Sequence, residues 1–219
     1  MIKKAFTMVE ILITLGIIGV VAAITLSNLI KEYKAHTLKS QFFKASSVIS
    51  QLASQLENDG LNFRGSSFTS YLKLQKKCRI DHHGTYCNNK TISYKLFNYR
   101  NNPSYFYFGY LNSTMAILSD GMVIYTDDCP DYEGWKGPLV GVDINGIDKG
   151  PNRLGYDFFL FENVAGKIYP LGHEKTNYGN INFSTNKTDY CSKSDFSSNS
   201  GLTCASKALS DSKYFNKLW

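Results

Sequence analysis

FTMVEILITLGIIGVVAAITLSNLI, residues 6–30, is the longest apolar run of the chain. After Glu10 it carries no charged side chain as far as Ile30. About twenty helical residues, each rising about 1.5 Å, span about 30 Å, the thickness of the hydrocarbon core of a bilayer. The run therefore predicts a membrane-spanning helix. A carboxylate at its front is unfavourable in lipid, so we expect Glu10 to have a partner or a function.

Three interpretations of this run compete. A conventional secretory signal has a shorter apolar region with a small-residue cleavage site after it. A plain signal anchor explains the length of the run and places Lys3 and Lys4 on the cytoplasmic side. Neither explains Glu10, nor the abrupt step from Ala5 to Phe6. The third interpretation is a leader, residues 1–5, that is removed in front of the helix.

The segment closely resembles the class III signal of type IV pilins and type II secretion pseudopilins. In that family a short basic leader ends in a small residue, cleavage falls before Phe, and Glu is the fifth residue of the mature chain. Lys3, Lys4, Ala5, Phe6 and Glu10 stand at those positions here, an apolar run follows, and the motif covers only about 25 residues of the chain. The resemblance implies that a prepilin peptidase cuts between Ala5 and Phe6 and that Phe6 is N-methylated.

The segment departs from the family at two positions. Ala5 stands where the family usually has Gly, a small residue in either case. Ser27 stands where many relatives have Pro, so the helix keeps its hydrogen bond there and should kink less. For Glu10 the resemblance implies a contact with the positive N-terminus of Phe6 on a neighbouring subunit. The alternative is a carboxylate that lies at the level of the lipid headgroups.

The helical period continues after the polarity changes at Lys31. Apolar residues then recur at steps of three and four, which predicts an amphipathic helix over residues 31–58. These residues are Leu38, Phe42, Phe43, Ala45, Ile49, Leu52, Ala53 and Leu56. Asn58, Asp59 and Gly60 should end it, with Gly60 as the cap. We therefore expect one continuous helix of two halves, residues 6–30 and 31–58.

Residues 59–219 are rich in Tyr, Phe, Asn, Ser and Gly, as strand-and-turn domains are. Asp120-Gly121 and Ala165-Gly166 predict two hairpin turns. We predict strands at 92–99, 105–111, 115–118, 122–125, 139–144, 157–161 and 167–169, with short helices in 61–77 and 204–217. Successive hairpins favour an antiparallel sheet on the apolar stripe of the helix, an α+β fold with the ladle-shaped layout of pilins.

Five cysteines follow the apolar run: Cys78, Cys87, Cys129, Cys191 and Cys204. They form no CxxC pair, so disulfides in an extracytoplasmic compartment explain them better than zinc does. The loops 78–87 and 191–204 are the easiest to close, which leaves Cys129 over. We interpret 78–87 as a polar loop, its adjacent His82 and His83 as solvated side chains, and 171–200 as a loop-rich region closed by the second disulfide.

The segment DINGIDKGPNRLGYD, residues 143–157, brings oxygen side chains together at Asp143, Asn145, Asp148, Asn152 and Asp157. Such oxygens among glycines suit a hard cation, calcium. The segment begins like an EF-hand loop but lacks its spacing and its terminal Glu. It is similar to a loop of many pilin-like proteins, and some pseudopilins hold calcium near their sheet. The alternative is a loop closed by its own Asx turns, without a metal.

The sequence contains no catalytic or nucleotide-binding fingerprint, so we expect no enzyme and no required cofactor. The formal charge of +6 is scattered and predicts no nucleic-acid partner. The resemblance implies a structural subunit of a type IV pilus or of a type II secretion pseudopilus. Its partners would be other subunits, the prepilin peptidase and methyltransferase, the inner-membrane assembly machinery and, before assembly, lipid.

The same resemblance implies a single-pass protein of the bacterial inner membrane. Its C-terminal domain would be extracytoplasmic, and the subunit would later enter a filament in the periplasm or on the cell surface. The alternative function is a minor pilin or adhesin whose loops bind DNA, a surface or an exported protein. The polar C-terminal region is the part that such a binding module would vary.

Overall fold

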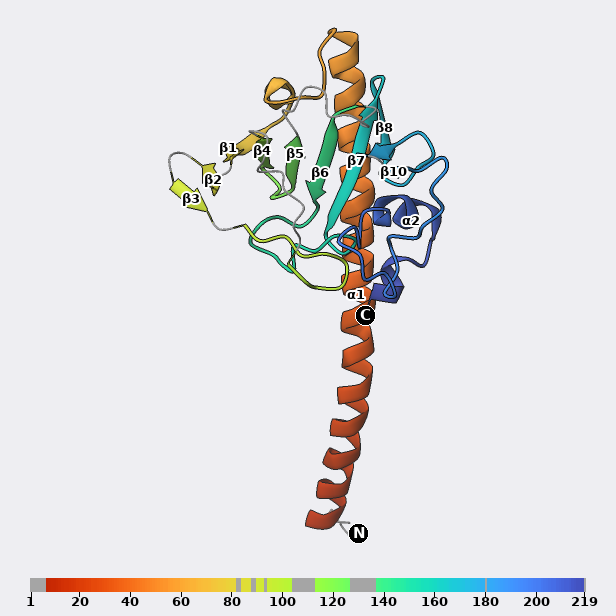
Figure 1. The fold of residues 1–219 in the computed structure, drawn as a ribbon. Helices are drawn as coiled ribbons and strands as arrows, with labels where there is room; N and C mark the ends of the chain where they lie inside the picture. Colours follow the sequence, from red (N-terminus) through yellow and green to blue (C-terminus); the bar gives the residue numbers. More distant parts are fainter. Residues whose placement is uncertain are drawn as a thin grey trace.

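The computed structural model describes residues 7–81, 84–87, 90–92, 94–103, 113–126, 137–179 and 181–218. It consists of one long helix, α1 (Met8–Asn58), with a sheet-containing domain packed on the C-terminal half of that helix (Figure 1). The N-terminal half projects from the domain as a bare stem, and the C-terminal end of the chain lies where the stem leaves the domain. This is the α+β arrangement of helix and sheet that the sequence predicts.

Local sequence signals set both ends of α1. Thr7 is the N-cap, and its hydroxyl accepts a hydrogen bond from the Glu10 N–H at 3.3 Å. At the other end Gly60 adopts a positive φ of 67°, and the Leu61 N–H donates to the Leu56 carbonyl at 2.8 Å. This is the usual glycine-terminated helix end. The helix therefore ends where the sequence predicts that it ends.

The two halves of α1 differ in what covers them. Its buried residues all lie in the second half. They include Ala35, which the predicted stripe did not contain, and the predicted Leu38, Phe42, Ala45, Ile49, Leu52, Ala53 and Leu56. Phe43 is an exception, because its side chain is 43% exposed and lies off the buried face. From Thr7 to Lys34 every residue is exposed.

The described strands form one antiparallel sheet in the order β3-β2-β1-β4-β5-β6-β7-β8, and β9 and β10 form a separate small hairpin. The strands are β1 (Leu74–Asp81), β2 (Gly84–Cys87), β3 (Lys90–Ile92), β4 (Ser113–Leu118), β5 (Val123–Thr126), β6 (Leu139–Asp143), β7 (Phe158–Val164), β8 (Lys167–Pro170), β9 (Asn177–Tyr178) and β10 (Ile181–Asn182). The predicted hairpins at Asp120-Gly121 (β4–β5) and Ala165-Gly166 (β7–β8) are both present.

Two predictions about the strands are wrong. Residues 78–87 are not a polar loop, because β1 and β2 pair there with Cys78 opposite Cys87. Residues 94–99 are not part of a strand, and Phe97 makes only isolated bridges to Pro103 and Arg153. The predicted strand at 105–111, the pair His82 and His83, and Cys129 lie outside the described residues.

Strand β7 shows how the sheet is buried on both faces. Phe159 and Phe161 point to α1, where the Phe42 ring lies 4.5 Å from that of Phe159. Phe158 and Leu160 point to the opposite face. That face is covered by side chains from the C-terminal region: Leu171, Phe183, Tyr190 and Leu202. The loop-rich region is therefore a third layer of the domain, packed on the sheet.

Both predicted disulfides are present, with Cα–Cα distances of 4.4 Å for Cys78–Cys87 and 4.8 Å for Cys191–Cys204. The second disulfide ties the C-terminal loop to α2 (Cys204–Ser210). The short helices expected in 61–77 and 204–217 are η1 (Ser67–Tyr71), α2 and η3 (Phe215–Leu218). The Phe215 ring packs 5.5 Å from Phe42, which places η3 against α1.

Candidate functional site: the exposed stem and the acidic loop

The stem presents a continuous apolar surface that nothing in the described chain covers. Large side chains on all of its sides, from Met8 to Ile30, are at least 44% exposed. Both of its glycines, Gly16 and Gly19, have open space where a side chain would be. A helix this apolar is not stable in contact with water, and it needs lipid or other helices around it. By length and composition α1 contains a segment able to cross a membrane.

Glu10 has a partner within its own chain. One of its carboxylate oxygens, Oε2, accepts from both the Thr7 N–H and the Thr7 hydroxyl, each at 2.8 Å. Together with the bond from the Glu10 N–H to Thr7, this is a capping box. The sequence signal was Thr-x-x-Glu in front of an apolar run, and our sequence analysis missed it. Ala5 and Phe6, the predicted cleavage site, lie outside the described residues.

The capping box stabilises the Glu10 carboxylate within its own helix. A carboxylate in the first turn interacts favourably with the positive end of the helix dipole. Both bonds to Thr7 are made within one chain, so the carboxylate has hydrogen-bond partners without any second molecule. The arrangement also keeps the carboxylate at the N-terminal tip of the helix, three residues from Thr7.

The acidic loop joins β6 to β7 and is built around two buried carboxylates. Asp143 and Asp157 are both fully inaccessible to solvent. Asp143 Oδ1 accepts from the Gly146 N–H at 2.8 Å and the Asn145 N–H at 3.3 Å, and its Oδ2 accepts from the Tyr94 hydroxyl at 3.0 Å. These bonds tie the end of β6 to its own loop and to Tyr94, 49 residues earlier.

Asp157 closes the other end of the same loop. Its Oδ1 accepts from the Arg153 N–H at 2.6 Å. Its Oδ2 accepts from the Asn152 N–H at 3.0 Å and from Asn145 Nδ2 at 3.3 Å. The oxygens of both aspartates therefore accept hydrogen bonds from backbone N–H groups of the same loop, as the side chain does in an Asx turn.

Burial, together with the nearby charge of Asp157, raises the pKa of Asp143 to about 7. Burial also raises the pKa of Asp157. The hydrogen bonds that each carboxylate accepts oppose these shifts without cancelling them. The loop thus holds two acids whose simultaneous ionisation is unfavourable.

The two aspartates among the predicted calcium ligands already have protein donors for their oxygens. All four oxygens of Asp143 and Asp157 accept hydrogen bonds from the protein, and Asp148 is exposed. Two buried amide oxygens, those of Asn145 and Asn152, lack a hydrogen-bond partner. In the part of the chain that the structure describes, no group of three or more His, Cys, Asp or Glu side chains could hold a metal ion. The arrangement is that of a loop closed by Asx-type bonds.

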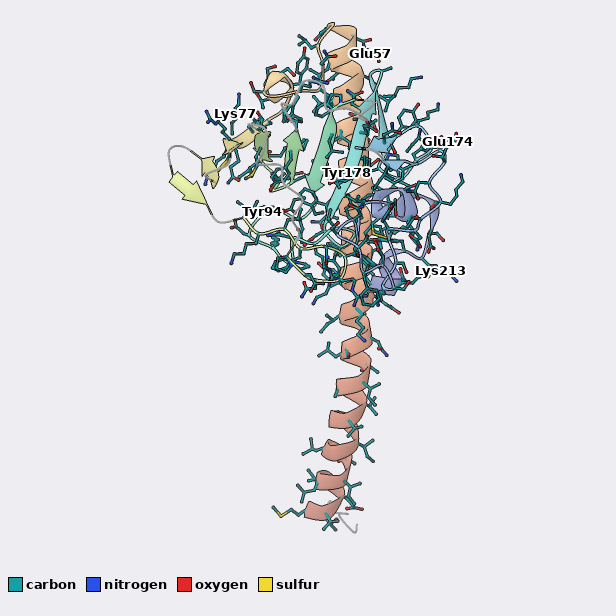
Figure 2. The ribbon with its side chains drawn as sticks, viewed as in Figure 1. Glu57, Lys77, Tyr94, Glu174, Tyr178 and Lys213 are labelled. Atoms are coloured by element: carbon teal, nitrogen blue, oxygen red, sulfur yellow. A yellow bond between two sulfur atoms is a disulfide. The ribbon has the colours of Figure 1, made fainter. Side chains whose placement is uncertain are left out.

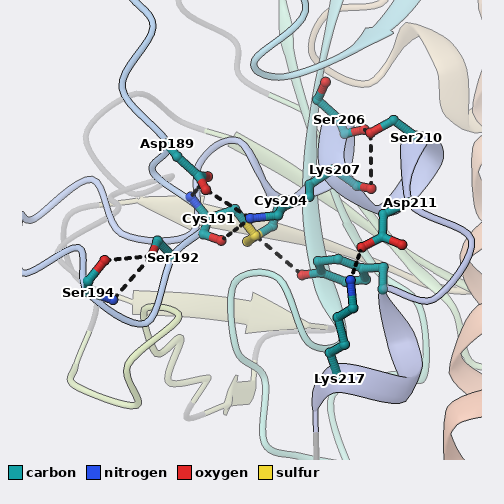
Figure 3. Close-up of polar contacts among 11 residues, drawn as sticks. Asp189, Cys191, Ser192, Ser194, Cys204, Ser206, Lys207, Ser210, Asp211 and Lys217 are labelled. Carbon is teal, nitrogen blue, oxygen red and sulfur yellow. Dashed lines mark hydrogen bonds and ion pairs between the residues drawn. A yellow bond between two sulfur atoms is a disulfide. The ribbon is translucent and has the colours of Figure 1, made fainter.

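The C-terminal region carries the second polar cluster, around the Cys191–Cys204 disulfide (Figure 3). Lys207 Nζ donates to Asp189 at 2.8 Å and to the Cys191 carbonyl at 3.1 Å. The Tyr214 hydroxyl lies 3.5 Å from Cys191 Sγ and donates to the Gly155 carbonyl. These contacts attach the disulfide loop to Gly155 of the acidic loop.

A groove of about 390 Å³ opens beside this cluster. Its lining is polar and includes Glu174, Asn186, Lys187, Asp189 and Lys207. No protein-family model, curated protein or solved structure matches the chain.

Proposed function

We propose that the chain is a structural subunit of a type IV filament, either a pilus or a type II secretion pseudopilus. One observation carries the proposal: a single helix has one half that is apolar and wholly exposed and another half that is packed on a sheet. Lipid can surround the exposed half before assembly, and sister helices can surround it afterwards. The domain on the second half is then displayed on the outside of the helical core.

In this proposal the N-terminal residues have separate roles. The prepilin peptidase cuts after Ala5, and Phe6 becomes the methylated N-terminus. Thr7 and Glu10 then lie in the first turn of the mature helix, where their capping box holds the carboxylate. In the filament Glu10 meets the positive N-terminus of a neighbouring subunit. A pair of charges in a dry helix bundle sets the register of the subunits, because the misaligned pair leaves both charges unsatisfied.

Mass spectrometry of the N-terminus tests the proposal. The chain is co-expressed with a prepilin peptidase, and we expect a mature protein that begins with N-methylated Phe6. An Ala5→Gly variant, which restores the residue usual in the family, should be processed at least as completely. A bulky Ala5→Leu variant is the matched control and should keep Met1. A wild-type chain that keeps Met1 beside an active peptidase would falsify the proposal.

A second candidate function is that of a minor pilin or adhesin, and the polar groove beside the Cys191–Cys204 disulfide favours it. The groove offers charges of both signs, Lys187 and Glu174 among them, on a region held rigid by the disulfide and by α2. Rigid scaffolds with polar loops are typical of binding sites. The copy number of the subunit along purified filaments separates the two functions, since a minor subunit is present in few copies.

A further inference from the structure

The underside of the domain, the end from which the stem emerges, carries a concentration of lysines. The groove between α1 and the acidic loop is lined by Tyr33, Lys34 and Lys149. On the neighbouring side Lys39 Nζ donates to the Ser212 carbonyl, which holds the C-terminal segment against the same turns of α1. Three segments that are distant in sequence therefore meet around the helix at one level.

We call this surface the basic underside and define it by the lysines that these segments bring there. They are Lys31, Lys34, Lys39, Lys149, Lys213 and Lys217. The carboxylates on the same segments are fewer: Glu32, Asp148 and Asp211. One of these, Asp211, is engaged by Lys217 at 2.7 Å. The surface as a whole is cationic, and Figure 2 shows Lys213 at its edge.

The rise per residue of α1 gives the distance between this surface and the end of the apolar run. Lys31 and Lys34 follow Ile30 by at most four residues, or about 6 Å along the axis. The headgroup layer of one leaflet is about 5–8 Å thick. The first two lysines therefore lie within the headgroup layer when residues 11–30 span the hydrocarbon. Lys149 lines the same groove as Lys34 and so lies near that layer, and the lysines of the C-terminal segment lie farther from it, where the attraction is more strongly screened at physiological salt.

We infer that the basic underside binds the phosphates of anionic phospholipids while the subunit is in the membrane. The inference rests on the membrane stage of the proposed function and not on assembly. Charge complementarity carries it, because cationic groups at the membrane surface attract anionic lipid and each contributes a few-fold to the association. Tyr33, which is exposed at the same level, is a residue type enriched at membrane interfaces.

Lipid selectivity of the full chain tests the inference. The chain is reconstituted into phosphatidylcholine vesicles that contain spin-labelled phosphatidylglycerol or spin-labelled phosphatidylcholine, and the fraction of immobilised label is compared. The test variant carries three substitutions, Lys31→Glu, Lys149→Glu and Lys213→Glu. In the wild type the ammonium groups of these three lysines make no ion pair within the described chain. The matched control is Lys73→Glu, Lys76→Glu and Lys77→Glu, at exposed positions on the other end of the domain, where Figure 2 shows Lys77.

For the wild type and the control we expect the anionic lipid to be preferred by about threefold or more, and for the test variant we expect nearly equal association. Lys3 and Lys4 are common to all three proteins, so the difference between variants excludes them. Inorganic phosphate at about 10 mM should leave the preference in place, because a surface of spaced charges binds a lipid layer better than a free ion. A preference abolished by phosphate would show a discrete phosphate site instead and overturn the inference.

Equal selectivity of the test and control variants would also overturn the inference while leaving the filament proposal intact. If the test variant lost self-association instead of lipid preference, the surface would contact another subunit. A chain that stays out of the vesicle fraction would contradict both proposals. A chain that shows the lipid preference but keeps Met1 beside the peptidase would contradict the proposed function alone.

Discussion

Glu10 has one partner in its own chain, Thr7, and in the proposed filament it would have a second, the N-terminus of a neighbouring subunit. A Glu10→Gln variant keeps the side-chain bond of the capping box but removes the charge, whereas Glu10→Leu removes both. We expect both variants to enter the membrane normally and to give at most about a tenth of the wild-type filament yield, because the contact between subunits needs the charge. Sheared filaments and membrane fractions measure the two quantities. Wild-type yield from Glu10→Gln would leave capping as the role of this residue.

Asp143 makes stability depend on pH in a defined direction. Its folded-state pKa of about 7 lies above the value of 3.8 for the unfolded chain, so the folded state holds a proton that the unfolded chain releases. The stability that this group contributes is therefore fully present below pH 3.8 and is lost as the pH rises through about 7. Between pH 5 and pH 7 the decrease from this group is up to about 2 kcal/mol. Asp143→Asn should flatten the profile in thermal melts of the chain in detergent.

Thermal melts of the same kind test whether the acidic loop binds calcium. With the carboxylate oxygens of Asp143 and Asp157 occupied by protein donors, we expect calcium at about 5 mM and its removal by a chelator to leave the melting temperature unchanged. A rise in melting temperature that the chelator reverses, and that Asp157→Asn abolishes, would show that the loop rearranges around a cation.

For the pH prediction, a melting temperature of Asp143→Asn that changed with pH as steeply as that of the wild type would show that the titration assigned to Asp143 is wrong.

Some of the site could be predicted at the level of single residues, and some of it could not. The Thr7-x-x-Glu10 capping box depends on four adjacent residues, so the signal was available in the sequence. The bond from Tyr94 to Asp143 joins residues 49 positions apart, and it depends on tertiary packing, since the Tyr94 ring also lies 5.6 Å from that of Tyr125 in β5. The sequence of the acidic loop shows which side-chain oxygens are present, but it does not show which backbone N–H groups donate to them, so the calcium site stays a prediction.

At the level of elements, adjacent phenylalanines of α1 provide an internal comparison. Phe42 is fully buried against Phe159 and Phe215, and Phe43 is 43% exposed. Phe42→Leu should lower the free energy of unfolding by about 1–3 kcal/mol, and Phe43→Leu by less than about 0.5 kcal/mol. Chemical denaturation of the two variants measures the difference. Equal losses would mean that α1 is rotated relative to the sheet from the orientation described here.

The elements differ in how well their sequences predict them. The second half of α1 has a regular apolar period, and its buried face was predicted except at Ala35 and Phe43. Strand β1 reads LQKKCRID, in which polar and charged side chains predominate, so its sequence gives only a weak signal for a strand. Its position in the sheet comes from pairing with β4 and from the disulfide to Cys87. Such pairing is a property of the assembled sheet and not of the strand.

For the whole molecule, the stem and the domain should be separable. Residues 7–30 are exposed throughout, and they contribute nothing to the buried core. A chain that starts at residue 31 should therefore fold, remain monomeric in water without detergent, and melt within a few degrees of the full chain in detergent. Circular dichroism and light scattering measure these properties. Aggregation of the shortened chain would mean that the stem also stabilises the domain.

The uninterrupted course of α1 has a mechanical consequence. Ser27 lies within the helix where a proline would have interrupted its hydrogen bonds, and the same rod continues from Met8 into the domain as far as Asn58. In a filament, tension would pass from rod to rod along the axis, with the sheet beside this path and not in it. The outer domain could then lose strands to force or proteolysis while the fibre kept its length. Stiffness and display are thus assigned to different parts of one chain.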